Sequence, residues 1–374
     1  MTGAATPLLA TPLRSVHLRL GGRMVDFAGW DMPVQYPGGI VAEHHAVRQG
    51  CGLFDLSHMG RVYVRGAGAL ALSQQCMTRD LTRVEAGQAA YGLLCRDDGG
   101  ILDDVIAYVL APEELLFVFN ASNREKDVAW FQEQRQRLGL QALLDDDTFQ
   151  TALIGVQGPN GQRILQRLTP VDLGSMPGYS FRQGEVAGRE ALIARTGYTG
   201  EDGFELCLAA VDAEAAWMSL LDGGNVTACG LGARDTLRTE AGMPLYGHEI
   251  DEATNPYEAG LGWAVQLGKG DFSGRERLAA LKEAGPSRKL VGLLVEEGGV
   301  PRPGHPIVSR EAPVGQVTSG TFSPTLKRNI AMGYVSTAAI SDELAVEIRG
   351  KAVPATIVPL PFVPHHSRPR APRT

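Results

Sequence analysis

Two adjacent aspartates after a Gly-Gly turn, Asp103 and Asp104, are the strongest candidates for proton chemistry in this sequence. Successive side chains on a strand point to opposite faces, so the two carboxyls do not line one cavity together. Asp104 would share its face with Ile106 and Tyr108, and apolar surroundings raise the pKa of a carboxyl toward values useful for proton transfer. We therefore expect Asp104 to be functional and Asp103 to be solvated. Alternatively, both acids only extend the turn.

A glycine-rich segment at 195–205 is a second candidate site. It holds three glycines within seven residues, and glycine lets a backbone adopt unusual angles and approach a ligand closely. We expect Tyr198 and Glu201 to project from this segment. A carboxylate there can accept paired N–H donors from a heterocycle such as a pterin. The alternative is a glycine-rich hairpin turn whose acids are solvated.

Arg234 and Arg238 form a third candidate. Four residues apart on a helix, they share one face, and an arginine can grip a carboxylate with two hydrogen bonds. Either arginine can instead pair with Asp235 or Glu240 on a neighbouring turn, which is the commoner fate of such charges. Spacing alone leaves both interpretations open.

Metal, nucleotide and serine-hydrolase chemistry have little support in the sequence. His44, His45 and His58 lack cysteines or carboxylates at the spacing of a tetrahedral metal site. The run Gly66-Ala-Gly68 lacks the third glycine of a dinucleotide-binding loop, and no Gly-x-Ser-x-Gly occurs. We therefore expect no metal, and a bound cofactor whose chemistry the protein positions.

The elements that must position these residues can be predicted in part. The aspartate pair falls in a three-stranded antiparallel meander. Its strands are expected at 90–95, 101–110 and 115–120. A helix at 123–138 should follow, begun by a capping box from Ser122 to Glu125 and ended by Gly139. The same box recurs at Ser273–Glu276, and Asp212 should begin another helix.

Strands and helices mix without regular βαβ alternation, which predicts an α+β fold with mixed or antiparallel sheets. From about residue 287 short β-rich runs separated by Pro and Gly predict a β-barrel-like domain. A chain of 374 residues exceeds one ordinary core. The expected domains are a discontinuous α+β domain at 1–50 and 140–286, a second at 51–139, and a β domain at 287–374 with a short Pro/Arg-rich tail.

Composition limits the partners. Hydrophobic residues at 44% and charged residues at 21% are typical of a globular protein. A formal net charge of −7 without a long basic run gives no electrostatic basis for binding nucleic acid. No apolar run approaches the roughly 20 residues that span a bilayer. Five scattered cysteines suit a reducing compartment. We expect a cytoplasmic, bacterial protein with no nucleic-acid or membrane partner.

Several segments together resemble the glycine cleavage system T-protein family, and the resemblance runs from Thr11 to about Pro364. The matching segments read Met-Val-Asp-Phe-Ala-Gly-Trp, Phe-Asp-Leu-Ser-His-Met-Gly, Arg-Thr-Gly-Tyr-Thr-Gly-Glu-Asp-Gly-Phe-Glu, Gly-Leu-Gly-Ala-Arg-Asp and Thr-Ser-Gly-Thr-Phe-Ser-Pro-Thr-Leu. Several independent matches in the right order indicate a relationship rather than chance.

The resemblance implies a three-domain cloverleaf around a central channel that takes tetrahydrofolate, pterin first. It also implies an aminomethyltransferase. The methylene carbon of S-aminomethyl-dihydrolipoyl H protein passes to tetrahydrofolate, giving 5,10-methylenetetrahydrofolate, ammonia and the dihydrolipoyl H protein. The lipoylated H protein is then the partner and tetrahydrofolate the co-substrate, and neither a metal nor a flavin is implied. The alternative is a non-catalytic folate-binding protein of the same fold.

The resemblance also assigns residues. It makes Asp104 the catalytic acid, gives Glu201 the recognition of the pterin and places Arg234 in the substrate site. Further residues implied to line the folate pocket are Tyr91, Asn120, Tyr198 and Met59. After Pro364 the chain reads His365-His366-Ser367 where other members have tyrosine or arginine, so the resemblance assigns no folate contact to this segment.

Overall fold

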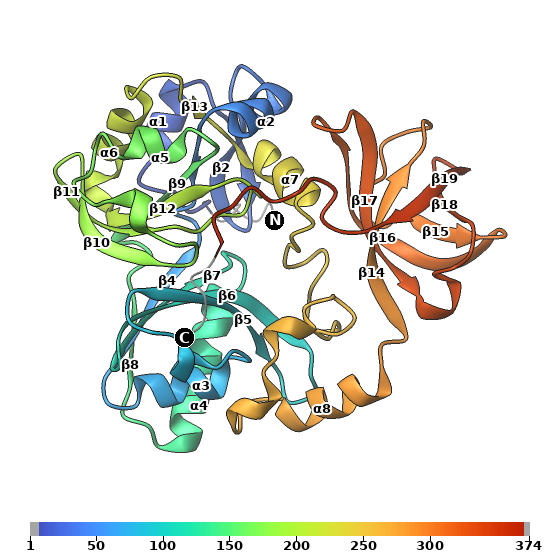
Figure 1. Cartoon of the computed structure of the whole chain (residues 1–374), viewed down its shortest axis with the longest axis horizontal. Coiled ribbons are helices and arrows are strands. Elements are labelled where there is room, and N and C mark those ends of the chain that lie inside the picture. The colour runs from blue at the N-terminus through green and yellow to red at the C-terminus, as the bar shows by residue number, and fades with distance from the viewer. Residues whose placement is uncertain (1–6, 370–374) are drawn as a thin grey trace, which may run out of the picture.

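The structure, a computed structural model, describes residues 7–369 and has three lobes around a common centre (Figure 1). Two lobes are built on open sheets, and the third is a closed barrel. Helices and sheets are mixed, and the barrel lies in the C-terminal part of the chain. The predicted α+β class and C-terminal β domain are therefore confirmed.

The first lobe is a six-stranded sheet in the order β10-β11-β12-β9-β3-β13. Its strands are β3 (Gly52–Asp55), β9 (Thr151–Gln157), β10 (Phe181–Val186), β11 (Arg189–Ala194), β12 (Gly203–Ala209) and β13 (Thr227–Ala228). Its helices are α1 (Arg14–Arg19), α2 (Ile40–Gln49), α5 (Gly161–Leu165), α6 (Ala213–Leu221) and α7 (Leu231–Glu240). A hairpin of β1 (Arg23–Phe27) and β2 (Trp30–Gln35) packs beside α7. Trp217 of α6 is fully buried in the same core as Ile154 and Leu206, which fixes this helix on the sheet.

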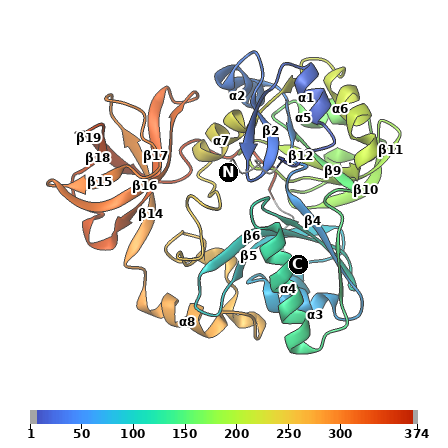
Figure 2. The same cartoon turned by 180° about the vertical axis from the view of Figure 1, so that it is seen from behind.

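The second lobe is a five-stranded sheet in the order β5-β6-β7-β4-β8. Its strands are β4 (Gly60–Arg65), β5 (Gln88–Cys95), β6 (Ile101–Ala111), β7 (Glu114–Phe119) and β8 (Leu143–Asp146). Helices α3 (Ala69–Cys76) and α4 (Arg124–Leu138) cover one face (Figure 2). Phe131 of α4 packs against Phe117 and Phe119, with ring centroids 5.0 and 5.7 Å apart. The predicted meander is confirmed as β5, β6 and β7.

The chain crosses between the two open sheets twice, from β3 to β4 and from β8 back to β9. Arg61 at the start of β4 is fully buried and holds the two crossings together. Its guanidinium donates to the carbonyls of Ser57 and Met59 in the first crossing and of Thr148 and Thr151 at the second. These two crossings make the open sheets one interlocked body.

Strand pairing puts three segments in a different lobe from the one expected. Strand β3 pairs with β9 and so belongs to the first sheet, whereas β8 pairs with β4 and belongs to the second. Residues 250–284, which end in α8 (Arg275–Ala284), pack with Leu278 and Phe272 against Leu93 and Ile101 of the second sheet. Local sequence shows that a strand forms but not which distant strand lies beside it, so boundaries drawn from local pattern are wrong here.

The third lobe is a barrel that closes in the order β14-β17-β16-β15-β18-β19. Its strands are β14 (Arg288–Val295), β15 (Pro306–Ser309), β16 (Ala312–Ser323), β17 (Arg328–Ser336), β18 (Leu344–Ile348) and β19 (Lys351–Val358). Strand β14 pairs with both β17 and β19, which closes the ring and leaves no open edge. The barrel begins within a residue of the expected boundary near 287.

Helix α4 forms where predicted and ends at Gly139, whose φ of +62° is the left-handed angle that glycine favours. The predicted capping box is wrong. The residue at the N-cap position is Asn123, and its side chain donates to the Asp103 carboxylate at 2.7 Å instead of capping the helix. The box at Ser273 does not form either, because α8 begins after Gly274. Asp212 precedes α6 as predicted but makes no side-chain cap.

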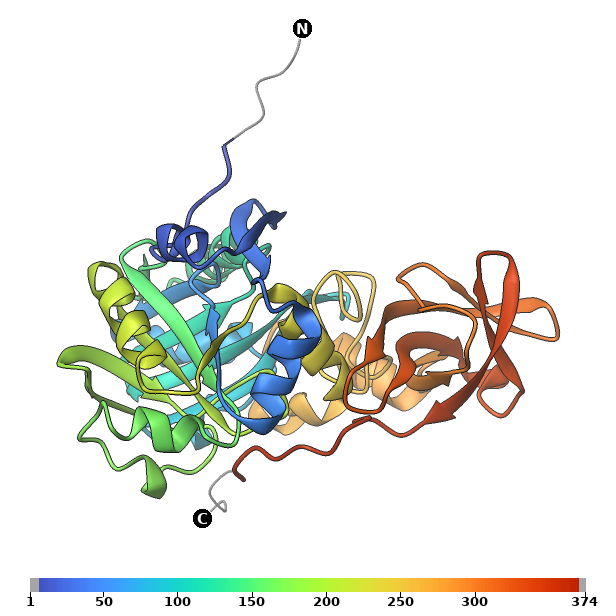
Figure 3. The same ribbon diagram turned by 90° about the horizontal axis from the view of Figure 1, so that it is seen from above.

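After the barrel, the chain returns to the first lobe (Figure 3). We call residues 359–369 the C-terminal strap. Its backbone is held by hydrogen bonds from Val363 to the Glu240 carbonyl, from His366 to the Gly200 carbonyl and from Gly178 to the Pro369 carbonyl. The last five residues of the predicted Pro/Arg-rich tail lie outside the described residues. No helix within 7–369 is long and apolar enough to cross a membrane.

Candidate active site

A cavity of about 1160 Å³ lies where the three lobes and the C-terminal strap meet. All seven residues predicted for the site line it. They are Met59, Tyr91, Asp104, Asn120, Tyr198, Glu201 and Arg234. Segments that are up to 175 residues apart in sequence therefore meet around one cavity, which no local pattern could establish.

The second sheet places three of these residues in one row. Leu93 pairs with Asp104 across β5 and β6, and the register of β6 with β7 brings Asp104 opposite Asn120. Met59 follows in the same row, because Gly60 pairs with Phe119. Neighbouring strands lie about 4.8 Å apart, so the row forms a continuous patch of cavity wall.

Asp104 is held by two hydrogen bonds. Its Oδ2 accepts from the Tyr91 hydroxyl at 3.1 Å, and its Oδ1 accepts from Asn120 Nδ2 at 2.8 Å. The Tyr91 ring is fixed in turn by stacking on Trp263 at 5.5 Å. Burial, and then the negative charge of Asp103, raise the pKa of Asp104 to about 7. A carboxyl with that pKa can hold or release a proton at neutral pH.

Asp103 is not solvated, contrary to expectation. Its side chain is fully buried and accepts hydrogen bonds from the Asn120 amide, from Asn120 Nδ2 and from Asn123 Nδ2, at 3.0, 2.8 and 2.7 Å. Alternation along β6 predicted the two faces correctly, but helix α4 covers the second face. A strand with both faces covered leaves neither aspartate in bulk water.

Glu201 is a buried, paired carboxylate rather than a solvated turn acid. Its Oε1 accepts from Arg48 Nη1 at 2.8 Å, and Nδ1 of His366 lies 3.0 Å from its Oε2. Arg48 belongs to α2, and His366 belongs to the C-terminal strap. Sequence reasoning missed both, since Arg48 lies 153 residues from Glu201 and carries no motif of its own.

The two arginines of α7 have different surroundings. Arg238 is buried and paired with Glu249 at 2.7 Å and with Asp235, so for this residue the pairing alternative is confirmed. Arg234 forms no ion pair with any carboxylate within residues 7–369, and its guanidinium lies 4.7 Å from the centre of the Tyr198 ring. Arg234 is therefore free to bind an anionic group that enters the cavity.

The cavity wall also contains groups that were not predicted. His58 lines it and is 2% exposed, with no hydrogen-bond partner for its Nδ1 in the described part of the chain. Burial lowers the pKa of His58 to about 3, so its ring is neutral. His365, Ser367 and Arg368 of the C-terminal strap also line the cavity. The strap thus reaches the site.

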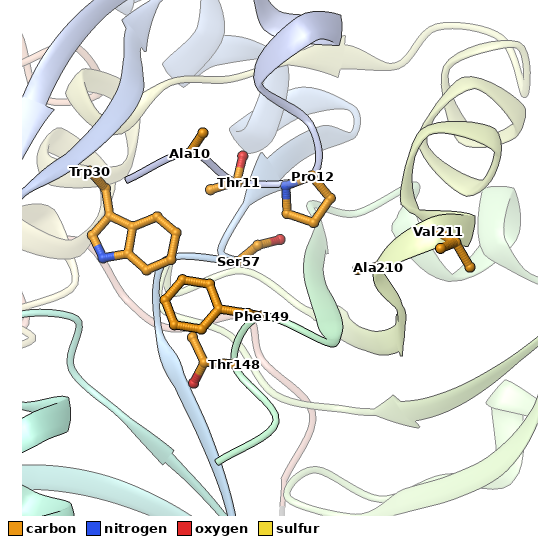
Figure 4. Close-up of a pocket in the computed structure, with 9 residues that line it drawn as sticks. All are labelled: Ala10, Thr11, Pro12, Trp30, Ser57, Thr148, Phe149, Ala210 and Val211. Atoms are coloured by element: carbon orange, nitrogen blue, oxygen red, sulfur yellow. The ribbon is translucent and has the colours of Figure 1, made fainter. Parts of the chain in front are cut away.

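A second, shallow hollow of about 400 Å³ lies near Thr11 (Figure 4). The rings of Trp30 and Phe149 stack there at 5.6 Å. No titratable side chain lines this hollow, so the candidate chemistry belongs to the larger cavity. In residues 7–369 no group of three or more His, Cys, Asp or Glu side chains is arranged to hold a metal ion.

Comparison with known proteins covers both parts of this architecture. The sequence model of the GCVT N-terminal domain matches residues 13–269, and that of the glycine cleavage T-protein C-terminal barrel domain matches residues 288–364. This chain belongs to the glycine cleavage T-protein family. The second match coincides with the barrel, so the boundary found in the structure is also a boundary of the family.

Relatives in the family agree over almost the whole chain. The aminomethyltransferase of Symbiobacterium thermophilum is 48% identical over 365 residues, which are 95% of this chain and 97% of the relative. The aminomethyltransferase of Geobacillus kaustophilus is 48% identical over 362 residues, which are 95% of this chain and 98% of the relative. The crystal structure of the glycine cleavage system aminomethyltransferase T from Bartonella henselae is 34% identical, with a TM-score of 0.91, covering 97% of this chain and 100% of that one. The chain is a transferase of the aminomethyltransferase family, as predicted.

Proposed function

We propose that this protein transfers the methylene carbon of an S-aminomethyl-dihydrolipoyl group, carried by the lipoylated H protein, to tetrahydrofolate, with release of ammonia. The observation that carries the proposal is Asp104, a half-buried carboxyl at the wall of a large cavity, which is held by Tyr91 and Asn120 and has its pKa raised to about 7. Family membership supplies the reaction class. The arrangement of this chain's own side chains supports the roles below.

The cavity suits a folate. Ligand sites commonly enclose about 300–1,000 Å³, and this cavity of about 1160 Å³ leaves room for a second group beside the folate. Its lining combines apolar strand residues with buried carboxylates, Glu201 among them, and with the guanidinium of Arg234, which forms no ion pair within residues 7–369. When bound, tetrahydrofolate supplies the nitrogens that accept the methylene carbon. We propose that Glu201 binds the pterin N–H donors and that Arg234 binds in the substrate site.

The other residues hold these groups in place. Arg48 and His366 fix the Glu201 carboxylate from two sides, so it meets a ligand in one orientation. Tyr198 is fixed by its hydrogen bond to the Pro244 carbonyl and by the Arg234 guanidinium on its ring. Tyr91 and Asn120 aim the Asp104 carboxyl, and Met59 extends the apolar wall. We propose that Asp104 provides a proton as the amine leaves, which its pKa near 7 permits at neutral pH.

We also propose a cytoplasmic location. All five cysteines are buried and unbridged, which suits a compartment that keeps thiols reduced.

The experiment compares methylenetetrahydrofolate formation, from aminomethylated H protein and tetrahydrofolate, by the wild type, Asp104→Asn and Asp97→Asn. Asp97 lies in the same turn but is exposed, so it is the matched control. Loss of one acid–base group costs about 10²–10⁴-fold in rate, so we expect that loss in Asp104→Asn alone, with tetrahydrofolate binding retained. Folate binding without wild-type turnover would instead identify a non-catalytic folate-binding protein of the same fold.

A further inference from the structure

A second buried acid, Asp127, lies behind Asp104 and has no part in the roles proposed so far. Asp127 is in the first turn of α4, on the side that covers β6, and its side chain is fully buried. Neither of its carboxyl oxygens has an N–H or O–H donor within residues 7–369. An ionised carboxylate in that position would be a buried, unpaired charge, which costs several kcal/mol.

The neighbour of Asp127 is Asp103, whose own surroundings identify its charge state. Three N–H donors point at the Asp103 oxygens, two from Asn120 and one from Asn123. N–H donors stabilise the ionised form, and an ionised carboxylate accepts about four hydrogen bonds. Asp127 follows Asn123 by one turn of α4, and its amide donates to the Asn123 carbonyl at 2.8 Å. Its carboxyl is therefore on the side of the helix from which Asn123 reaches Asp103, and it is a hydrogen-bonding neighbour of Asp103. Two carboxyls in contact do not both ionise, so the proton belongs to the one without donors.

We propose that Asp127 stays protonated at neutral pH, donates a hydrogen bond to Asp103 and thereby fixes the negative charge of Asp103 beside the Asp104 carboxyl. Asp127 is then a positioning residue for proton transfer by Asp104, and in that role the inference rests on the proposed function. Asn120 completes the connection, because its Nδ2 donates to Asp103 and to Asp104, at 2.8 Å in each case.

The electrostatics agree with this assignment. Burial, followed by the charge of Asp103, raises the pKa of Asp127 well above its usual range. The charge of Asp103 is also the largest contribution after burial to the raised pKa of Asp104. Other charged or titratable groups near the cluster are Lys126 and Tyr246, beside Asp127 and Asp103, and Tyr91 and Tyr198, beside Asp104. Lys126 Nζ is drawn to the Tyr246 hydroxyl and to Glu252, at 2.8 and 3.1 Å, and forms no ion pair with the aspartates.

Two substitutions distinguish the effect of the hydrogen-bond donor of Asp127 from the effect of its side-chain volume. Asp127→Asn keeps an N–H donor toward Asp103, whereas Asp127→Leu has similar volume and no donor. Without that donor the Asp103 carboxylate is no longer fixed beside Asp104, so its charge raises the pKa of Asp104 less. We expect the pH profile of kcat in Asp127→Leu to move to lower pH by about one unit, with little change in KM for tetrahydrofolate. Asp127→Asn should restore the wild-type profile.

The control on the same helix turn is Glu125→Gln, since the Glu125 side chain is 90% exposed and should affect neither quantity. A profile that is unchanged in Asp127→Leu, or shifted equally in Asp127→Asn, would overturn the proposal.

The protonation state of Asp127 can also be measured directly, in an experiment that needs neither enzyme activity nor a folded Asp127→Leu variant. In protein labelled with carboxyl-¹³C aspartate, we expect one resonance to stay at the protonated position from pH 5 to pH 8 and to be absent from Asp127→Asn. An Asp127 resonance that titrates below pH 5 in the folded wild type overturns the inference. A protonated Asp127 in a protein without transferase activity would overturn the proposed function and leave the charge assignment intact.

Discussion

The two oxygens of the Asp104 carboxyl have different partners, and this difference can be used to shift its proton affinity. Tyr91 donates to Oδ2 and Asn120 to Oδ1. Both donors favour the ionised form and so oppose the effect of burial and of the Asp103 charge. Removing one donor without disturbing the other should therefore raise the pKa of Asp104 further.

Tyr91→Phe makes that change, because phenylalanine keeps the ring that stacks on Trp263 and loses only the hydroxyl. We expect the pKa of Asp104 to rise by about one unit, so that Asp104 keeps its proton to higher pH and the pH profile of transfer moves in the alkaline direction. Tyr257→Phe is the control, since the Tyr257 hydroxyl has no partner within residues 7–369. A profile that stays in place would show that the Tyr91 contact does not affect the site.

For single residues, the sequence indicated which side chains to consider more reliably than it indicated what surrounds them. Alternation along a strand placed Asp104 and Asp103 on opposite faces, and the glycine-rich segment left open whether Glu201 is solvated. The local sequence pattern could not show that helix α4 covers Asp103, nor that Glu201 pairs with Arg48, which lies 153 residues away in sequence. Contacts of that range depend on how elements pack, which a local pattern does not contain.

The position of the turn before β6 determines whether Asp104 faces the cavity, and close packing at Gly100 fixes that position. A Cβ added to Gly100 would be 2.1 Å from the Glu252 carbonyl oxygen, and the neighbouring Ile101 amide donates to the Thr254 carbonyl at 3.0 Å. Backbone therefore packs on backbone at this point, with no flexible side chain to move aside.

We expect Gly100→Ala to lower the free energy of unfolding by about 1–3 kcal/mol and to reduce transfer, because the start of β6 is displaced three residues before Asp103. Gly268→Ala is the matched control. No atom lies within 4 Å of its added Cβ, so its cost should stay within about 0.5 kcal/mol. Urea unfolding of both variants measures the difference, and equal stabilities would contradict the close packing described here.

Helix α7 ends on Glu240, which joins three elements. Its carboxylate accepts from Arg48 of α2 and from Ser323 and Thr325 at the end of β16. Burial alone would raise the pKa of Glu240, but hydrogen bonds from His44, Ser323 and Thr325 outweigh it and lower the pKa to about 2. The barrel is thus attached to the first lobe by a contact that depends on pH.

A lowered pKa in the folded state contributes stability that is present above the ordinary pKa of about 4.3 and is lost as the pH falls toward 2. We expect Glu240→Gln to be less stable than the wild type at pH 7 by roughly 3 kcal/mol, with a difference that shrinks between pH 4.5 and pH 2. Unfolding midpoints across this range test it. Glu283→Gln, at an exposed position on α8, should follow the wild type throughout, and a parallel loss in both variants would argue against the contact.

Across the whole molecule, the C-terminal strap ties the barrel to the first lobe and contributes to the cavity. His365, Ser367 and Arg368 line the cavity, and His366 contacts Glu201. A chain that ends at Pro364 should remain folded, since the cores of all three lobes lie outside the strap. Its affinity for tetrahydrofolate should fall by about tenfold, or 1.4 kcal/mol, because Glu201 loses one of its two supports. Calorimetric titration measures this loss, and an unchanged affinity would exclude a role for the strap in binding.

The sequence predicted a lobe correctly only where that lobe is formed by one continuous stretch of the chain. The barrel is one continuous stretch, so a change in local pattern near residue 287 located it. Strand β3 lies in the first sheet and β8 in the second, whereas the sequence predicted the opposite for both. Their partners are distant in sequence, and a local pattern does not show which distant strand lies beside them.

The two crossings that Arg61 braces also constrain how genes for this fold can be rearranged. A single exchange of coding sequence can replace the barrel, because residues 288–364 carry all of its strands. Any exchange between β3 and β9 would leave one of these strands without its partner. Two walls of the cavity therefore come from sheets whose strands are interleaved along the sequence, whereas the third comes from one continuous stretch, and an exchanged barrel must keep its contacts with α7 through Ser319, Ser323 and Thr325.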